Sequence, residues 1–531
     1  MLQTTRGLRG VVTSPHHAAS QAGLEVLRDG GSAVEAAVAT AATLAVVYPQ
    51  MNSIGGDGFW LIAEPGQAPI GVDACGRAGA AVDLDLYARH GLTEIPRRGP
   101  LAANTVAGTI SGWTAALAAD RRGEREALPL ARLLKAAIEY AEQGVSIAAS
   151  TAATIAAKRA ELAGQPGFAD VFLPNGRTPQ PGAVLRQPAL ARTLTALAED
   201  GLDSFYRGPL AERIAKDLAA AGSPVTGEDL ARHHAIQTAP LQVDVAGTRL
   251  FNMPPPTQGV AALMILALFD RLRVGEADGF EHLHGLVEAT KRAFRFRDRH
   301  VGEPDDMTVD PQALLDDAGE LDRLASEIDG RRALGWPLAE SGGDTVWLGV
   351  IDGRGQAVSM IQSTYFEFGS GVVLGETGVT WQNRGSSFRL VRQGWNRLRP
   401  GARPFHTLNP AMARFSDGRV MAYGTMGGEG QPQTQAAVFT RYARFGQDLQ
   451  AAVSAPRWLL GRTWGADSTT LKLEARFAPA LVEALRAAGH EVETVEAFDE
   501  MMGHAGAVVR HADGRLEGAT DPRSDGAVAA F

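Results

Sequence analysis

The chain has 531 residues, which is long enough for one large core or for several domains. Hydrophobic residues make up 45% of it and charged residues 21%, an ordinary balance for a globular protein. Its 51 basic and 60 acidic residues give a net charge of −9, which argues against a nucleic-acid or anionic-membrane partner.

Cysteine content and the N-terminal sequence indicate the cellular compartment of the protein. Cys75 is the one cysteine in the sequence, so a framework of disulfides within the chain is excluded. The first ten residues contain no apolar signal-peptide core. The longest apolar run, near 36–48, is too short to cross a bilayer. If the chain is complete, we expect a soluble cytoplasmic protein.

The first part of the chain predicts strands alternating with alanine-rich helices. Hydrophobic spacing places a strand at 10–14, helices at 17–29 and 32–47, and paired strands at 58–63 and 70–74. The middle, from about 128 to 328, is predicted to be mostly helical, with helices at 130–143, 187–199, 208–221 and 259–272.

The last part of the chain predicts mainly strands. They are expected at 345–352, 356–363, 370–374, 378–381 and 419–424, before helices at 433–445 and 477–488 and a terminal strand pair near 493–497 and 505–511. Helices, then sheet, then helices in one chain predict an α/β (α+β) layered sandwich rather than a doubly wound fold.

The junction at Thr345 offers candidate chemistry. A polar bend at Gly342–Gly343–Asp344 leads into an apolar strand that begins with Thr345, and 352–355 reads as a hairpin turn. If the Asp344–Thr345 bond is cut, the Thr345 hydroxyl sits beside a free α-amino group with a pKa of about 7.7–8.0. A β-branched residue that merely starts a strand is the alternative interpretation.

Common catalytic and metal motifs are missing from the sequence. It contains no phosphate-binding loop, dinucleotide fingerprint, H-E-x-x-H, C-x-x-C or G-x-S-x-G. His282 and His284 are the best metal-like pair, but residues i and i+2 of a helix do not face each other. We therefore expect no metal and no cofactor.

Three loops are rich in small or polar residues. The loops at 53–58 and 424–430 hold adjacent glycines, whose N–H groups can converge on an oxyanion. The segment 403–410 places an imidazole, a hydroxyl and an amide between two prolines. Each loop taken alone could equally be a tight turn.

Five segments taken in order resemble the γ-glutamyltransferase family of N-terminal-nucleophile hydrolases: 30–59, 344–371, 403–410, 424–428 and 518–526. The resemblance implies a four-layer αββα sandwich made as a precursor that cuts itself before a threonine. It implies a large subunit 1–344 and a small subunit 345–531, intertwined in one fold, with a homodimer of such pairs as a further option. The expected substrate is a small-molecule amide.

The same resemblance assigns the catalytic residues. Thr345 becomes the nucleophile and Asp344–Thr345 the cleavage site. Ser363 falls where the family has a hydroxyl that hydrogen-bonds the threonine amine. Gly427 and Gly428 fall on the pair that forms the oxyanion hole.

The substrate pocket departs from the family pattern. Where the family holds the glutamyl α-amino group with an asparagine, a glutamine and an aspartate, this chain has Tyr365, Arg384 and Ser387. Where two serines hold the α-carboxylate, it has His406 and Thr407.

Three further departures lie outside those positions. The family usually reads TTH at the cut, and this chain reads Thr345-Val346-Trp347. Arg77 lies close to the place expected for the family's carboxylate-binding arginine. The segment between Phe388 and Arg403 is short for the usual active-site lid.

Loss of the acidic group and gain of Arg384 predict an anionic substrate without an amino group, because guanidinium binds carboxylate in a forked geometry. Segments 381–388 and 405–410 resemble the branch of the family that contains oxamate amidohydrolase, a purine-breakdown enzyme. The alternatives are a γ-glutamyl hydrolase or transferase, an acylase that removes a dicarboxylic side chain, and a binding scaffold that is never processed.

Overall fold

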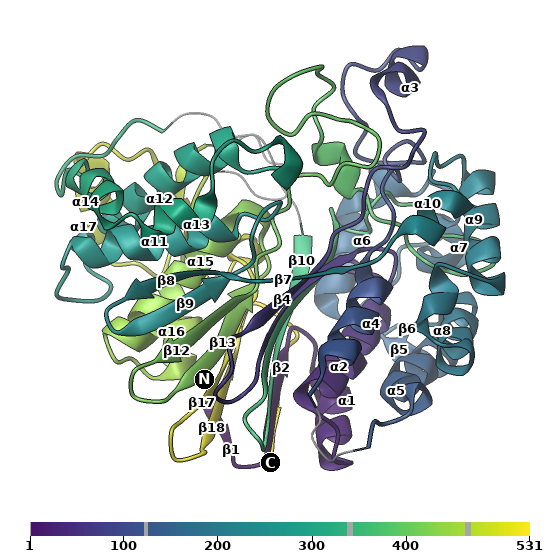
Figure 1. Ribbon diagram of the computed structural model, residues 1–531, viewed down its shortest axis with the longest axis horizontal. Coiled ribbons are helices and arrows are strands. Elements are labelled where there is room, and N and C mark those ends of the chain that lie inside the picture. The colour runs from purple at the N-terminus through teal and green to yellow at the C-terminus, as the bar shows by residue number, and fades with distance from the viewer. Residues whose placement is uncertain (1, 122–125, 337–343, 462–468) are drawn as a thin grey trace.

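Two seven-stranded sheets lie face to face in the middle of the molecule, and helices cover their outer faces (Figure 1). The computed structural model describes residues 2–121, 126–336, 344–461 and 469–531. The arrangement is the four-layer αββα sandwich that the sequence predicts.

The first sheet contains the strand that begins beside Thr345. That strand, β10 (Asp344–Asp352), pairs antiparallel with β2 on one side and with β11 (Ala357–Tyr365) on the other. The full order is β19 (Ala527–Ala530), β2 (Gly10–Ser14), β10, β11, β3 (Asp57–Ala63), β4 (Ile70–Ala74) and β7 (Ile236–Thr238). Strands from both sides of residue 344 therefore share one sheet.

The second sheet also combines strands from before and after residue 344. Its order is β1 (Thr5–Gly7), β18 (Leu516–Thr520), β17 (Ala505–Arg510), β13 (Val420–Thr425), β12 (Ala411–Phe415), β9 (Thr248–Asn252) and β8 (Leu241–Val245). All its neighbouring pairs are antiparallel. Strand β13 ends at the glycine-rich loop, so this sheet carries the predicted oxyanion residues at its edge.

Trp347 of β10 fills the space between the two sheets. A Cβ added to Gly424 or Gly506 on the facing sheet would lie 2.3 or 2.5 Å from its ring, so both positions need glycine. The indole Nε1 donates to Ser359 Oγ at 2.9 Å. Because interiors are close-packed, this fit fixes the first residues of β10 against the second sheet.

Helices cover each sheet from outside. On the first sheet lie α1 (His17–Arg28), α2 (Ala33–Val47) and α4 (Thr109–Ala119), with α5 (Leu130–Gln143) and α8 (Pro188–Asp200) outside them. On the second lie α11 (Gly259–Arg271), α15 (Gln431–Phe439) and α16 (Leu449–Ser454), with α12 (Phe280–His300) packed against α11 and α15. Every residue of α2 is buried, as expected for a helix that is apolar all round, and Ser32 caps it with Glu35.

The remaining helices and two small sheets lie around these layers. The helices are α3 (Leu84–Arg89), α6 (Ala149–Leu162), α7 (Phe168–Phe172), α9 (Pro209–Ala221), α10 (Gly227–Arg232), α13 (Pro311–Asp316), α14 (Ala318–Ser326) and α17 (Pro479–Ala487). The small sheets are β5 (Val145–Ser146) with β6 (Val184–Leu185), and β14 (Trp458–Leu460) with β15 (Leu471–Glu474) and β16 (Val492–Val495).

The predicted hairpin after Thr345 is confirmed. Asp352 accepts the N–H groups of Arg354 and Gln356, and Gly355 takes the positive φ of 92° that the turn requires. The register shifts between Asp344 and Val346, so a bulge lies at Thr345. The bend predicted at 342–343 lies outside the described residues.

Several predicted elements differ from the structure. The segments 370–374 and 378–381 are not regular strands, although backbone hydrogen bonds such as Trp381 N–H to the Val372 carbonyl join them around a bridge between Val373 and Thr380. The predicted terminal pair is wrong: β16 pairs with β15 in a small sheet, whereas β17 joins the second large sheet. The helical middle also contains β7, β8 and β9, which are only three to five residues long, and among them β8 alternates buried and exposed residues. Strands this short give a weaker sequence pattern than the helices around them.

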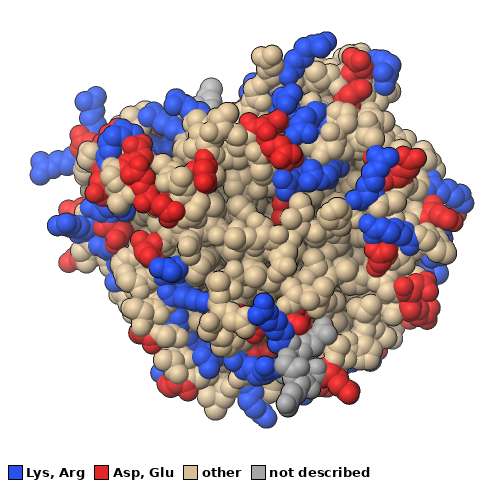
Figure 2. Space-filling model, viewed as in Figure 1, with Lys and Arg blue, Asp and Glu red and all other residues tan. Residues whose placement is uncertain are grey.

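No described helix is both long enough and apolar enough to span a bilayer. On the face shown in Figure 2, basic and acidic side chains alternate around the rim of the molecule.

Candidate active site

Thr345 lies in the interior at the start of β10. The residue is 1% exposed, and Gln431 Nε2 donates to its Oγ1 at 3.5 Å. Gln431 is the first residue of α15 and also accepts the Asn409 N–H at 3.3 Å. One amide side chain therefore joins the threonine to the segment that carries His406 and Thr407. Sequence reasoning missed Gln431, which follows the glycine loop directly.

Ser363 occupies the neighbouring strand β11. Its Oγ accepts the Tyr365 N–H at 2.8 Å, and it pairs in register with Asp57 of β3. Tyr365 ends the strand opposite Asp344 with a φ of +84°, a conformation that is costly for a residue with a side chain. Backbone strain of this kind is concentrated at functional sites.

The loop after β13 turns sharply at Gly427 and Gly428. Their φ values are +118° and +52°, and Gly428 opens a single 3₁₀ turn before α15. Neither N–H donates to an acceptor among the described residues. Two free N–H groups at a buried turn are suited to an oxyanion.

A buried side-chain network supports this loop. Gln258 Nε2 donates to the carbonyls of both Gly428 and Thr407 at 2.8 Å. Arg297 in turn donates to Gln258 Oε1 at 2.8 Å and pairs with Glu429 at 3.4 Å. The glycine loop and the Thr407 segment are thus held by one amide, a role that sequence spacing did not reveal.

Arg384 lies buried between Tyr365 and Thr407. Its guanidinium stacks on the Tyr365 ring at 3.8 Å, donates to Thr407 Oγ1 at 3.2 Å, and also donates to the Phe405 carbonyl. The Nε atom is buried and has no acceptor, and in the described ranges no carboxylate lies within ion-pair distance. A buried arginine without a direct counter-ion is suited to an anion.

Ser387 and Arg77 lie at the margin of this cluster. Ser387 is half-buried, and its hydroxyl donates to the Phe405 carbonyl at 3.4 Å. Arg77 donates to the Gly401 carbonyl at 2.9 Å and lies 3.9 Å from Glu303, with 41% of its side chain exposed. The structure gives Arg77 no contact with Arg384, so it joins the rim rather than the buried cluster.

His406 pairs with an acid that sequence reasoning did not single out. Its Nε2 lies 3.1 Å from Asp57 Oδ2, and both side chains are buried. Asp57 Oδ1 also accepts the Gly76 N–H and Gln382 Nε2, each at 2.9 Å. The only hint in the sequence was an acidic residue inside the glycine-rich loop 53–58.

Burial sets the protonation of these groups. Desolvation raises the pKa of Asp57 to about 7, against the opposing effect of its hydrogen bonds and of Arg384. Desolvation and the nearby Arg384 hold the pKa of His406 well below its ordinary value, so the imidazole is neutral. Burial also raises the pKa of the Cys75 thiol, which excludes a reactive thiolate.

Two clusters contain metal-ligand residue types. Asp57, Cys75 and His406 offer ligand atoms within 4.8 Å of one another, but both Asp57 oxygens accept hydrogen bonds and Arg384 lies beside them. The other cluster is His284, Glu288 and His490, where Lys291 and Arg292 pair with Glu288. His282 contacts Asp278 and Thr440 instead of His284.

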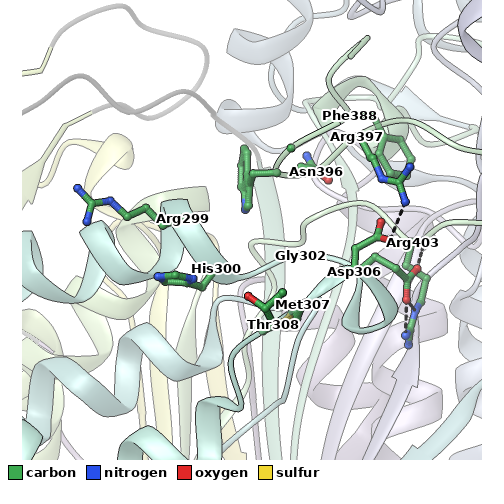
Figure 3. A pocket seen from close by; sticks show the side chains of 13 residues that line it. Arg299, His300, Gly302, Asp306, Met307, Thr308, Phe388, Asn396, Arg397 and Arg403 are labelled. Carbon is green, nitrogen blue, oxygen red and sulfur yellow. Dashed lines mark hydrogen bonds and ion pairs between the residues drawn. The ribbon is translucent and has the colours of Figure 1, made fainter. Parts of the chain in front are cut away.

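The segment after Ser387 is fastened against the site. Asn396 donates to the Ser387 carbonyl at 2.6 Å and accepts the Phe405 N–H at 2.8 Å, and Arg397 pairs with Asp306 at 2.9 Å. Figure 3 shows this segment facing the end of α12 across a polar pocket. The short segment predicted between 388 and 403, where the family has a lid, thus forms one wall of a pocket beside the buried cluster of Tyr365, Arg384 and Thr407.

Comparisons with known proteins agree with this geometry. The family model described as gamma-glutamyltranspeptidase matches residues 19–531. The chain belongs to the gamma-glutamyltranspeptidase family. Such proteins carry the N-terminal-nucleophile fold, and this chain is an amide hydrolase made as a proenzyme.

Three relatives cover nearly the whole chain. An oxamate amidohydrolase proenzyme from Klebsiella pneumoniae is 56% identical, over 98% of each chain. A glutathione hydrolase-like YwrD proenzyme from Bacillus subtilis is 41% identical, over 99% of each. The crystal structure of a cephalosporin acylase from Bacillus halodurans matches with a TM-score of 0.91 and 34% identity, covering 100% of this chain and 97% of that one.

Proposed function

We propose that Thr345 is the nucleophile and that it is freed by a cut between Asp344 and Thr345. The cut gives a large subunit 1–344 and a small subunit 345–531. The buried place of Thr345 at a bulge, its contact with Gln431 and the proenzyme names of the relatives support this assignment.

In the proposed reaction the Thr345 Oγ attacks the amide carbonyl of the substrate, and the free α-amine of Thr345 takes the hydroxyl proton. The N–H groups of Gly427 and Gly428 bind the resulting oxyanion. Ser363 keeps the amine in place. The amine then passes its proton to the leaving nitrogen, ammonia departs, and water hydrolyses the acyl ester on Thr345.

The substrate proposed is oxamate, which yields oxalate and ammonia. The observation that carries this choice is Arg384, a buried guanidinium without a carboxylate partner among the described residues. A substrate carboxylate beside the amide would pair with Arg384 and approach the Thr407 hydroxyl. His406, Tyr365 and Ser387 shape the pocket around it, and Arg77 stands at the rim. The name of the 56% identical relative, oxamate amidohydrolase proenzyme, supports the same substrate. We propose further that this chain acts in purine degradation.

The test compares two substrates on purified, processed protein. Ammonia release from oxamate should far exceed glutamate release from a γ-glutamyl anilide, because Arg384 stands where an ammonium group would need an acid. N-terminal sequencing of the small fragment should begin TVWLGV. Faster turnover of the γ-glutamyl anilide would mean that the substrate is a γ-glutamyl amide and not oxamate. The assignment of Thr345 as the nucleophile would stand.

A side-chain acylase is the second candidate, favoured by the 0.91 TM-score to a cephalosporin acylase. Such an enzyme would also bind a carboxylate, but at the far end of a longer acyl chain. Turnover of a glutaryl amide in the same assay separates the two, since the spacing between carboxylate and amide differs by three methylenes.

A further inference from the structure

Asp57 and His406 form a hydrogen-bonded dyad, and a backbone N–H determines which ring nitrogen of His406 carries the proton. The Leu408 N–H donates to His406 Nδ1 at 3.3 Å, so the ring proton of the neutral imidazole lies on Nε2 and points to Asp57 Oδ2. Asp57 Oδ1 accepts two further donors. The ionised carboxylate is therefore fully hydrogen-bonded although it is 0% exposed.

The charges around this dyad balance. Arg403 pairs with Asp73 and with Glu303, each at 2.7 Å, and Arg77 lies 3.9 Å from Glu303. Arg384 touches no carboxylate among the described residues, but its positive charge lowers the pKa of both Asp57 and His406. Three arginines thus face three carboxylates in and beside the site: Arg77, Arg384 and Arg403 with Asp57, Asp73 and Glu303.

A substrate carboxylate would disturb that balance. Bound to Arg384, it engages the guanidinium whose charge favours ionised Asp57, and it adds a fourth anion to a buried volume. An uncompensated buried charge is costly, and a carboxylic acid relieves the cost by taking up a proton. Asp73 keeps its contact with Arg403, and Glu303 keeps both arginines, so Asp57 is the group left without a counter-ion.

We propose that the Asp57–His406 dyad gains one proton when an anionic substrate binds Arg384, so that substrate charge is matched by proton uptake. The inference rests on the proposed function and adds a role for Asp57 as a positioning residue that tunes the affinity of Arg384 for anions. It leaves the attack by Thr345 unchanged.

The groups that face Asp57 favour this role. Asp73 comes from β4, Cys75 follows the end of that strand, and Tyr206 comes from the helical side. The 382–406 region supplies Arg384, Arg403 and His406. Cys75 and Tyr206 are neutral because burial raises the pKa of both. The pKa of Asp57 is about 7 even with Arg384 nearby, so a bound carboxylate raises it further and the proton is taken up from near-neutral solution.

The direction in which substrate affinity changes with pH follows from the thermodynamic linkage between substrate binding and proton binding. The complex holds the dyad proton more tightly than the free enzyme, so affinity is highest below the free-enzyme pKa of about 7 and falls as pH rises above it. Between the pKa values of the free and bound dyad, KM for an anionic substrate should rise by about tenfold per pH unit.

The experiment measures kcat/KM for oxamate and for oxamide, in which a carboxamide replaces the carboxylate, between about pH 6 and 9. Titration of the Thr345 amine affects both substrates equally and cancels in the ratio of the two values. The oxamate-to-oxamide ratio should be flat at low pH and fall by about tenfold per unit above neutrality, approaching a lower plateau above the pKa of the complex.

Two variants sharpen the test. Asp57→Asn fixes the dyad in a neutral form, so the ratio should lose its pH dependence, with the change carried by KM rather than kcat. Cys75→Ala alters a buried neighbour of Asp57 that has no role in the proposal, and it should keep the wild-type profile.

The outcomes separate the two proposals. Rapid oxamate turnover with a ratio that does not change with pH overturns proton uptake and leaves the proposed function standing. No oxamate turnover overturns the proposed function and this inference together. The wild-type comparison decides the matter even if Asp57→Asn does not fold.

Discussion

The two halves of the proposed active site consist of different kinds of chemical group. Around Thr345 the working groups are a hydroxyl, two glycine N–H groups and the amide of Gln431. Around Arg384 they are charged or titratable side chains, buried and linked in pairs. Backbone groups keep their chemistry whatever the substrate, whereas buried charges must match it. In the proposed mechanism the first half therefore determines the reaction, and the second determines which amide is accepted.

Removing the nucleophile should have the largest effect. Thr345→Ala should remain one chain near 56.0 kDa and show no turnover of any amide, since both cleavage and attack use the same hydroxyl. A denaturing gel and ammonia release report the two effects separately. Thr345→Ser is the matched control and should still cleave, because it keeps the hydroxyl. Cleavage of Thr345→Ala before residue 345 would contradict the mechanism.

The oxyanion loop comes next. Gly428→Val should lower kcat by about 10²–10³, the usual cost of one oxyanion donor, because a β-branched residue resists a φ of +52°. Gly375→Ala is a suitable control: its Cβ would meet open space. Circular dichroism should show both variants folded. Near-normal turnover by Gly428→Val would mean that this loop does not bind the oxyanion.

Arg384→Ala should act on substrate choice rather than on the reaction. We expect kcat/KM for oxamate to fall by the equivalent of about 2–5 kcal/mol, as when one side of a buried charge pair is removed. Turnover of neutral oxamide should change far less. Arg515→Ala, which breaks an exposed pair with Asp513, should alter neither value. Equal losses for both substrates would mean that Arg384 only supports the fold.

Gln258 connects the two halves, and its loss should have the smallest effect. Gln258→Leu leaves the Gly428 and Thr407 carbonyls without their buried donor and removes one acceptor of Arg297, which keeps its pair with Glu429. These losses should lower the free energy of unfolding by about 1–3 kcal/mol. Denaturant unfolding measures this. The kcat values for oxamate and oxamide should fall together, since the variant displaces both halves; a fall for one alone would show that they are independent.

Local sequence patterns predicted the reacting half better than the recognition half. The hairpin from Thr345 to Ser363 and the glycine loop at 424–430 are continuous segments, so turn chemistry and strand pattern reveal them. The resemblance assigned both Arg384 and Thr407 to the substrate pocket, and a hydrogen bond joins them in the structure. The fold followed from the same resemblance, apart from short strands such as β8 and β9.

The contacts that sequence reasoning missed are the long-range ones. Asp57 and His406 are 349 positions apart, and Gln258 reaches residues 149 and 170 positions away. No periodicity encodes such pairs, because they depend on how two sheets stack. Arg77 shows the reverse problem: its position in the sequence suggested the pocket, but its side chain turns to Gly401 and Glu303 at the rim.

The interleaving of strands across residue 344 has a consequence for how the mature protein loses its structure. A cut before Thr345 leaves β10 hydrogen-bonded to β2 from the other fragment, and β11 to β3. The fragments could then part only by unfolding both sheets. Refolding would become a bimolecular event that depends on protein concentration, whereas the uncut precursor folds as one chain. After processing, the native state would therefore persist because it unfolds slowly, and not because the separated fragments refold readily.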